Sequence, residues 1–255
     1  MGKIIAFSNQ KGGVGKTTTA INLAAYVAMW KKKVLIVDFD PQGNATSGFG
    51  VEKNNLEHNC YDVLMGDSAA KDVILPTMID NLWIMHSNSD LAGAEVDLVN
   101  VPARESVLKR ALSAIKDDYD YIFIDCPPSL GLLTLNALVA CDSVIIPIQS
   151  EFFALEGVTQ LMYTINIVKQ RLNPKLSING VILTMYDTRT VLSKQVTAEI
   201  FKYFSDTLYT VPVPRNIKLV ESPSFGVPVC LHSPHSSGAL AYQALARQFI
   251  EREES

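Results

Sequence analysis

A short glycine-rich loop near the amino terminus constrains the fold of this chain more than any other feature. Residues 9–19 read Asn-Gln-Lys-Gly-Gly-Val-Gly-Lys-Thr-Thr-Thr, and they lie between an apolar run at residues 4–7 and a helical pattern. Glycines let backbone N–H groups turn toward an anion, and a helix N-terminus adds partial positive charge at the same point. A strand, such a loop and a helix in this order predict a phosphate-binding site.

Two side chains at the end of the loop have defined chemistry. Lys16 can reach the β- and γ-phosphates of a nucleotide, and the hydroxyl of Thr17 can bind Mg²⁺. Gln10 stands where the usual pattern G-x-x-x-x-G-K-[ST] has its first glycine, and a further cation, Lys11, follows it. The motif is therefore a variant of the common phosphate loop. We expect the nucleotide to contact Lys11, Gly12, Gly13, Val14, Gly15, Lys16, Thr17 and Thr18.

Apolar runs alternate with helical patterns along the whole chain. Strands are expected at residues 4–7, 34–38, 82–86, 121–125, 143–148 and 180–184. Several of these runs are apolar at consecutive positions, as strands buried on both faces require. Helices are expected at residues 16–30, 103–116, 130–140, 155–172, 192–204 and 237–251. The alternation predicts a three-layer α/β fold, in which helices cover both faces of a mostly parallel, twisted sheet.

Composition bounds the class of protein. The 255 residues are 48% hydrophobic and 19% charged, which predicts a single domain over residues 1–255 with a large core. No apolar run approaches the length of about 18 residues that spans a bilayer, and no signal peptide is evident, so a cytoplasmic protein is expected. The four cysteines form no C-x-x-C pair, which argues against a zinc or iron–sulfur site. Because the net charge is -4, any contact with nucleic acid must come from a local basic patch.

Several motifs together resemble one family. The loop resembles the deviant Walker A motif of the ParA/MinD class of ATPases, whose additional lysine corresponds to Lys11. Residues 37–44 are similar to the first switch of that class, residues 124–129 to the second switch, and residues 212–216 to a late loop. The resemblance covers essentially the whole chain and is closest to the short chromosomal, Soj-like ParA type. It implies ATP and Mg²⁺ as cofactors, and ATP hydrolysis that is slow until a partner stimulates it.

The resemblance also assigns roles to individual side chains. In the family, the residue matching Asp40 positions the attacking water, and Asp38 supports the Mg²⁺ side of the site. Asp125 ends a buried strand, which is the usual place for a carboxylate that orients Mg²⁺. The residues matching Pro214 and Asn216 contact adenine. The expected catalytic residues are Lys11, Lys16, Asp40 and Asp125, and the expected metal-site residues are Thr17, Asp38 and Asp125.

An ATP-dependent homodimer follows from the same resemblance. A lysine on a flexible stem can cross a subunit boundary, so Lys11 would meet the phosphates bound by the partner. The dimer would carry a DNA-binding face with Arg189 and Lys218 at matching positions and Arg215 close in sequence. Contacts to phosphate make the binding of double-stranded DNA independent of sequence and sensitive to salt. A ParB-type centromere-binding partner and association with the nucleoid are implied, while the cargo, chromosome or plasmid, stays open.

Three other functions share this fold. A MinD-like regulator of division-site placement, which cycles on a membrane, is the principal alternative, but residues 251–254 are Glu-Arg-Glu-Glu and no membrane anchor is apparent. An iron–sulfur reductase needs paired cysteines at the dimer axis, and Cys126 has no partner at a matching place. An autophosphorylating tyrosine kinase needs a tyrosine-rich tail, whereas Tyr242 is the only tyrosine in the last 40 residues.

Overall fold

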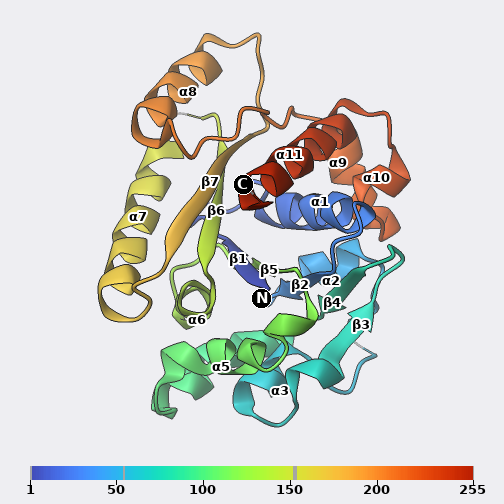
Figure 1. Ribbon diagram of the computed structural model, residues 1–255, viewed down its shortest axis with the longest axis vertical. Coiled ribbons are helices and arrows are strands. Elements are labelled where there is room, and N and C mark those ends of the chain that lie inside the picture. Colours follow the sequence, from blue (N-terminus) through green and yellow to red (C-terminus); the bar gives the residue numbers. More distant parts are fainter. Residues whose placement is uncertain (1, 54, 152–153, 255) are drawn as a thin grey trace.

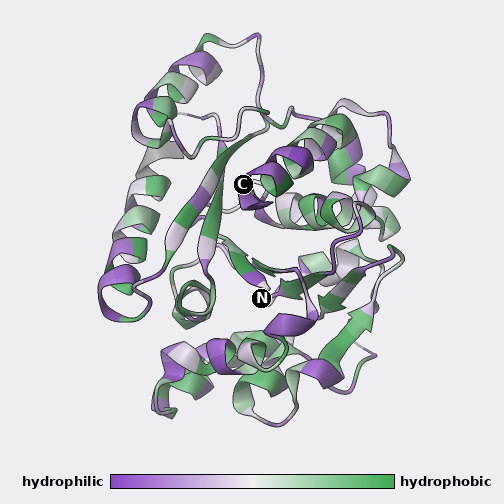
Figure 2. Cartoon of the chain, viewed as in Figure 1, coloured by the Kyte–Doolittle hydropathy of each residue, from purple (hydrophilic) through white to green (hydrophobic). Residues whose placement is uncertain are grey.

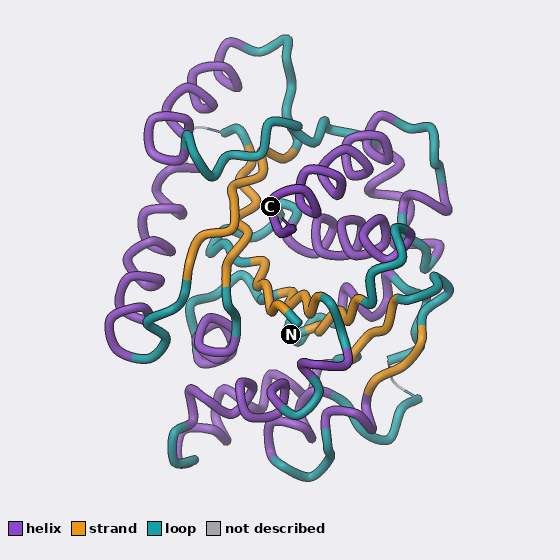
Figure 3. Tube along the Cα trace, viewed as in Figure 1, coloured by secondary structure: helices purple, strands orange, loops and turns teal. Residues whose placement is uncertain are grey.

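A seven-stranded sheet forms the centre of the computed structural model, which describes residues 2–53, 55–151 and 154–254. All neighbouring strands run parallel except the edge strand β3, which pairs antiparallel with β4. Figure 3 shows the strands as one twisted layer between helices. The predicted three-layer α/β fold is confirmed. In spatial order the strands are β3 (Ile74–Pro76), β4 (Leu82–Met85), β2 (Val34–Asp38), β5 (Tyr121–Asp125), β1 (Lys3–Phe7), β6 (Ser143–Gln149) and β7 (Ser177–Thr184).

Helices cover both faces of the sheet (Figure 1). One face carries α1 (Lys16–Met29), α2 (Asn44–Gly48), α9 (Ile217–Glu221), α10 (Val229–His232) and α11 (Ser237–Glu254). The other carries α3 (Cys60–Met65), α4 (Ala94–Asp97), α5 (Val107–Ser113), α6 (Leu132–Ala140), α7 (Ala154–Arg171) and α8 (Val191–Phe204). In the described part of the chain, no helix is both long and apolar enough to cross a membrane.

The central strands supply side chains to two cores. Ile5 and Phe7 of β1 join the core under α1 and α11, whereas Ile4 and Ala6 join the core on the opposite face. Because both faces are covered, consecutive positions are apolar, and the strands are coloured mainly hydrophobic in Figure 2. Phe123 of β5 meets Phe7 and Phe249 of α11 edge to face, with ring centroids 5.2 and 5.4 Å apart. The last helix is therefore part of the same core as the first strand.

The elements that sequence patterns failed to predict are short. The edge strand β3 and the helices α2, α3, α4, α9 and α10 have three to six residues each, too few for a hydrophobic period to show. The helix predicted at residues 103–116 was wrong in extent. A 3₁₀ turn over Arg104–Ser106 precedes α5, and a second over Lys116–Asp118 follows it. Ala103 has a φ of 51°, a left-handed conformation that prevents a regular helix from starting there.

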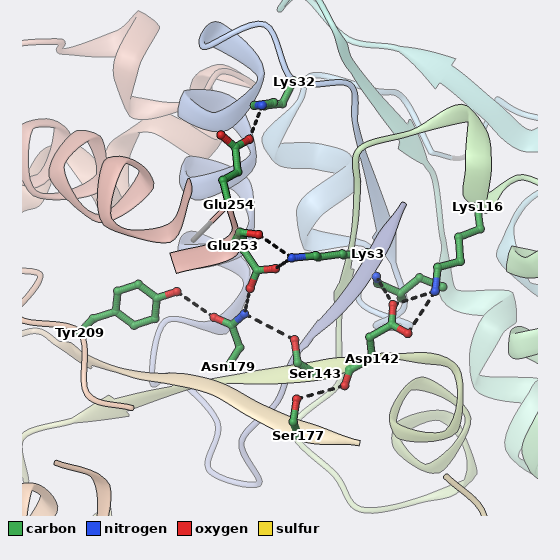
Figure 4. A network of polar contacts seen from close by, with 11 residues as sticks. Lys3, Lys32, Lys116, Asp142, Ser143, Ser177, Asn179, Tyr209, Glu253 and Glu254 are labelled. Carbon is green, nitrogen blue, oxygen red and sulfur yellow. Dashed lines mark hydrogen bonds and ion pairs between the residues drawn. The ribbon is translucent and has the colours of Figure 1, made fainter. Parts of the chain in front are cut away.

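Polar contacts tie the last helix to the amino-terminal edge of the sheet (Figure 4). Lys3 of β1 forms an ion pair of 2.7 Å with Glu253, and Glu253 also accepts a hydrogen bond from Asn179 of β7. Tyr209 donates to Asn179 at 2.8 Å, and the guanidinium of Arg252 lies 4.1 Å from the centre of the Tyr209 ring. The contacts join β1, β7 and α11, which are far apart in the chain.

Candidate functional site

The glycine-rich loop lies at the carboxyl edge of the sheet, between β1 and α1. Gly13 and Gly15 have left-handed backbone conformations, with φ of 73° and 87°, which residues with a side chain rarely adopt. Gly15 is also the residue that caps α1. A Cβ added to Gly13 would meet no atom within 4 Å, so this part of the loop faces open space. An anion can therefore approach the loop backbone.

Neighbouring strands hold the loop in this shape. Thr184, at the end of β7, donates its hydroxyl to the carbonyl oxygen of Val14 at 2.7 Å. Asn9 donates to the carbonyl oxygen of Pro147 in β6 at 2.7 Å and accepts from the backbone N–H of Lys11 at 3.0 Å. The loop is thus preorganised, which lowers the entropic cost of binding a ligand there.

Lys16 is a buried cation at the end of the loop, with only 6% of its surface exposed. Its ammonium donates to the carbonyl oxygen of Lys11 at 3.3 Å. Burial lowers the pKa of Lys16, and the nearby charges of Asp125 and Asp40 oppose that effect. An ammonium has three N–H donors, and burying it without partners costs free energy. Lys16 is therefore suited to an anionic ligand.

Asp125, at the end of β5, is fully buried, and neither carboxylate oxygen has a hydrogen-bond partner among the described residues. Burial raises the pKa of Asp125 well above its ordinary value, and the charge of Asp38 raises it further. The nearby Thr17 hydroxyl lowers the pKa of Asp125, although the two groups do not meet the geometry of a hydrogen bond. Orphaned carboxylate oxygens near a hydroxyl fit Mg²⁺, which binds one or two protein ligands together with phosphate oxygens. The described residues contain no cluster of three or more His, Cys, Asp or Glu side chains that could hold a metal ion alone.

The other two predicted carboxylates have partners in the protein. Asp38 is the direct neighbour of Asp125 in the sheet register and accepts from the N–H and the hydroxyl of Thr46, at 2.7 and 2.6 Å. Burial raises the pKa of Asp38 to about 6. Asp40 follows β2 and accepts from the N–H of Gln42 at 2.9 Å. Because Asp38 is satisfied by α2, Asp125 is the stronger candidate for the metal.

The additional lysine of the motif is held within its own subunit. The ammonium of Lys11 lies 2.9 Å from Oε2 of Glu151, which follows β6. The other oxygen of Glu151 accepts a hydrogen bond from Gln149. Both charged side chains are partly exposed, at 34% and 47%. A Lys11 that reaches a second subunit must first leave Glu151.

A cavity of about 320 Å³ opens beside the loop and is mainly apolar in lining. Its volume is within the range of small-molecule sites. Gly15 and Thr18 belong to the phosphate loop and the start of α1, so the cavity continues from the expected phosphate position. The predicted adenine residues Pro214 and Asn216 are brought here from the other end of the chain. The remaining lining residues are Thr184, Met185, Val213, Arg215, Leu219, Val220, Pro223 and Tyr242.

The amide of Asn216 is already engaged at both ends. Its oxygen accepts from the N–H of Lys218 at 2.8 Å and caps α9, and its nitrogen donates to the hydroxyl of Ser237 at 2.7 Å. A hydrogen bond from this amide to a base would have to share or replace one of these contacts.

Two of the three basic residues predicted to bind DNA form ion pairs within the chain. Arg189 makes two hydrogen bonds to the carboxylate of Asp187, at 2.9 and 2.7 Å, and Lys218 lies 2.8 Å from Glu221. Arg189 and Arg215 are exposed and line one hollow of about 670 Å³, whereas Lys218 does not line it. The arginines therefore form a common surface, whose positive charge is partly neutralised by Asp187.

Three residues of this region were missed by sequence reasoning as site residues. Thr184 supports the loop, Glu151 pairs with its lysine, and Tyr242 lines the cavity. Thr184 ends a predicted strand at the edge where ligands of parallel sheets bind, and that position was an available signal. Nothing local in the sequence distinguishes Glu151 or Tyr242.

The strand–loop–helix connection at this edge, above two buried charges of opposite sign, places the chain among the P-loop nucleoside triphosphatases. A family model described as an AAA domain matches residues 2–178. The chain is 55% identical over 248 residues to sporulation initiation inhibitor protein Soj of Bacillus subtilis, covering 97% of this chain and 98% of that protein. It is 51% identical over 253 residues to chromosome partitioning protein ParA of Myxococcus xanthus, covering 99% and 89%. The chain belongs to the Soj-like ParA family of chromosome-partitioning ATPases.

Solved structures agree with the fold. A Mycobacterium smegmatis protein named cobyrinic acid a,c-diamide synthase, solved with an ATP analogue and magnesium, superimposes with a TM-score of 0.88 at 36% identity, covering 100% of this chain and 97% of that one. The septum site-determining protein MinD of Pyrococcus horikoshii, complexed with Mg-ADP, superimposes with a TM-score of 0.79 at 27% identity, covering 97% and 96%.

Proposed function

We propose that this chain is a partition ATPase that uses Mg-ATP to switch between monomer and dimer. The observation that carries the proposal is the orphaned carboxylate of Asp125 beside Thr17, below a loop that ends in the buried cation Lys16. Mg-ATP would satisfy both buried charges at once. Relatives named Soj and ParA, at 55% and 51% identity over nearly the whole chain, support the role in partitioning.

The side chains divide the chemistry among them. Thr17 and Asp125 would hold Mg²⁺, which supplies neutralisation of charge on the phosphates. Lys16 and the loop N–H groups would bind and orient the β- and γ-phosphates. Asp40, buried just after β2, would orient the attacking water. The nucleoside would occupy the cavity beside Thr18 and Pro214. We expect slow hydrolysis until a ParB-type partner stimulates it.

Dimerisation would depend on Lys11. In the dimer its ammonium would exchange Glu151 for phosphate oxygens bound by the second subunit. A phosphate carries more charge than one carboxylate, so the exchange would favour the dimer when ATP is bound. ATP binding would therefore shift the monomer–dimer equilibrium, and hydrolysis would return it.

DNA binding would use the surface formed by Arg189 and Arg215, together with Lys218. These side chains would contact backbone phosphates of double-stranded DNA without reading its sequence, which would place the dimer on the nucleoid. Because the contacts would be to phosphates, binding should weaken steeply as salt rises. Asp187 would lower the affinity by competing for Arg189.

Sedimentation of the purified protein with ATP, with ADP and without nucleotide tests the switch. We expect a dimer with ATP only. Lys16→Gln should remain monomeric because it loses the phosphate contact, and Asp40→Ala should accumulate as a dimer because hydrolysis is blocked. Absence of an ATP-dependent dimer in the unmodified chain would refute the proposal.

Measurements of binding to duplex DNA of unrelated sequences, at low and moderate salt, test the proposed DNA-binding surface. Arg189→Glu should abolish binding by the ATP dimer, whereas Asp187→Asn should strengthen it because Arg189 is released. Lys202, which pairs with Glu199 on α8, offers a matched control, and Lys202→Glu should have little effect. An ATP dimer that ignores DNA and instead sediments with anionic liposomes would favour the MinD-like alternative.

A further inference from the structure

Tyr242 of α11 belongs to the wall of the cavity next to the phosphate loop. It lines the same cavity as Gly15 and Thr18, although only 1% of its surface is exposed. Its hydroxyl lies 3.0 Å from the hydroxyl of Thr19, and this contact is buried. Thr19 follows Thr18 in the first turn of α1. Tyr242 thus connects the cavity wall directly to the helix that begins at the phosphate loop.

The first turn of α1 is fixed from a second direction. The amide of Asn22 donates to the carbonyl oxygen of Thr18 at 2.8 Å and accepts from the N–H of Val229 in α10, also at 2.8 Å. Asn22 and Thr19 are both buried. Because α10 and α11 are both attached to the first turn of α1, this turn has little freedom to move toward or away from Tyr242.

A second part of the wall also rests on α11. Leu219 of α9 lines the cavity, and a Cβ added to Gly238 would lie only 2.7 Å from Cγ of Leu219. Residues four apart share one face of a helix, so Gly238 and Tyr242 present adjacent surfaces. The absence of a side chain at Gly238 lets Leu219 approach α11 closely. One helix face therefore sets the position of two cavity residues.

We infer that Tyr242 determines which base this site accepts, through the space that its ring leaves in the cavity. The inference rests on the proposed ATP switch and deepens it. Most of the lining is apolar, so fit and contact area discriminate between bases more than hydrogen bonds do. A purine is larger than a pyrimidine and fills more of such a cavity. A bound pyrimidine would leave part of the apolar cavity wall without contacts. Enlarging the cavity at Tyr242 should weaken the preference for the purine.

Equilibrium binding of Mg-ATP, Mg-UTP and inorganic tripolyphosphate to the full chain tests this inference. In Tyr242→Leu we expect the ratio of the ATP and UTP affinities to fall by about tenfold, the lower end of the discrimination that one methylene gives in an apolar pocket. Affinity for tripolyphosphate should be no lower in Tyr242→Leu than in Tyr242→Phe, because both variants lose the hydroxyl contact to Thr19 and keep the residues of the phosphate loop. Tyr242→Phe keeps the ring and should retain the preference within about twofold.

Phe249→Leu provides a matched control. Phe249 lies on the same helix and is fully buried, but it packs on Phe123 and Tyr121 of β5 and does not line the cavity. We expect it to keep the base preference despite a similar loss of stability. If Phe249→Leu and Tyr242→Leu lose the preference for ATP over UTP equally, or if Tyr242→Leu keeps it in full, the role of Tyr242 is refuted but the proposed function is not. A wild-type chain that binds no nucleoside triphosphate would overturn the proposed function itself.

Discussion

At the residue scale, the most informative pair is Asp38 and Asp125, which are neighbours in the sheet register but differ in their partners. Asp38 accepts two hydrogen bonds from Thr46, whereas Asp125 accepts none from the described residues. A buried charge without a partner costs free energy, and such strain is retained where a ligand relieves it. We therefore propose that Asp38 stabilises the fold and that Asp125 binds a ligand.

The first prediction compares Asp125→Asn with Asp38→Asn. Asp125→Asn removes a carboxylate that accepts no hydrogen bond from the described residues, although Lys16 lies close enough to interact with its charge. We therefore expect little change in thermal stability without nucleotide and a loss of Mg²⁺-dependent hydrolysis of about a hundredfold or more. Asp38→Asn should destabilise the protein by about 1–3 kcal/mol, because its amide nitrogen would face N–H donors. Thermal unfolding and phosphate release measure both. A marked destabilisation by Asp125→Asn would contradict the assignment.

A second prediction at this scale concerns the ion pair between Lys11 and Glu151. Glu151→Gln removes the competitor for Lys11, so the ATP-dependent dimer should form at protein concentrations about two- to fivefold lower, the range for an exposed ion pair. Sedimentation equilibrium measures this shift. Glu199→Gln, which breaks a similar exposed pair with Lys202 on α8, should leave the equilibrium unchanged. A weaker dimer in Glu151→Gln would show that Glu151 acts in the dimer itself.

At the scale of elements, the residue that caps the short helix α9 is expected to have two roles. Asn216 caps the helix with its amide oxygen and is also the residue predicted to contact adenine. Helix caps of this kind are worth about 1 kcal/mol. A single substitution therefore changes both the stability of α9 and the chemistry of the cavity, unless the replacement keeps the cap.

The third prediction separates those two roles. Asn216→Ala should destabilise the protein by about 1 kcal/mol and weaken ATP binding. Asn216→Ser can cap α9 with its hydroxyl, so it should recover most of the stability. If the amide contacts the base, Asn216→Ser will still bind ATP more weakly than the wild type. If Asn216→Ser instead recovers both the stability and the ATP affinity of the wild type, Asn216 acts only as the cap of α9. Thermal unfolding and titration with Mg-ATP provide the two measurements.

At the scale of the whole molecule, the ends of the chain are joined through the sheet. Lys3 of the first strand pairs with Glu253 of the last helix, and Tyr121, Phe123 and Phe249 share one aromatic cluster. We propose from these contacts that the chain is a single cooperative domain, because no large segment can unfold without exposing the shared core.

The fourth prediction concerns the unfolding of this single cooperative domain. Heat unfolding without nucleotide should show one transition, with equal calorimetric and van't Hoff enthalpies. Mg-ATP at about a hundred times its dissociation constant should stabilise the folded state by about 2.7 kcal/mol and raise the midpoint. The Asp40→Ala variant limits hydrolysis during the scan. Two separate transitions, with only one shifted by nucleotide, would show that α11 or another segment unfolds independently.

Much of the architecture could be predicted from local sequence. The central strands are continuous apolar runs that hold their pattern wherever they lie, and the loop at residues 11–18 carries its own turn chemistry in Gly13 and Gly15. Short elements such as α9 and β3 could not be predicted, because their sequences contain less than two turns or pleats of pattern. The same holds for the positive φ of Ala103, an exposed residue of a type that ordinarily avoids this conformation.

The sequence by itself determined the class of fold, the phosphate loop and the family, because each rests on motifs and apolar runs whose own residues are close together in the chain. Only the tertiary structure decided that Asp125 is orphaned while Asp38 is satisfied, that Glu151 holds Lys11, and that Tyr242 meets Thr19 beside the cavity. These relations join residues from different strands and helices. Their distances and burial are set by how the layers pack, and no local pattern encodes that packing.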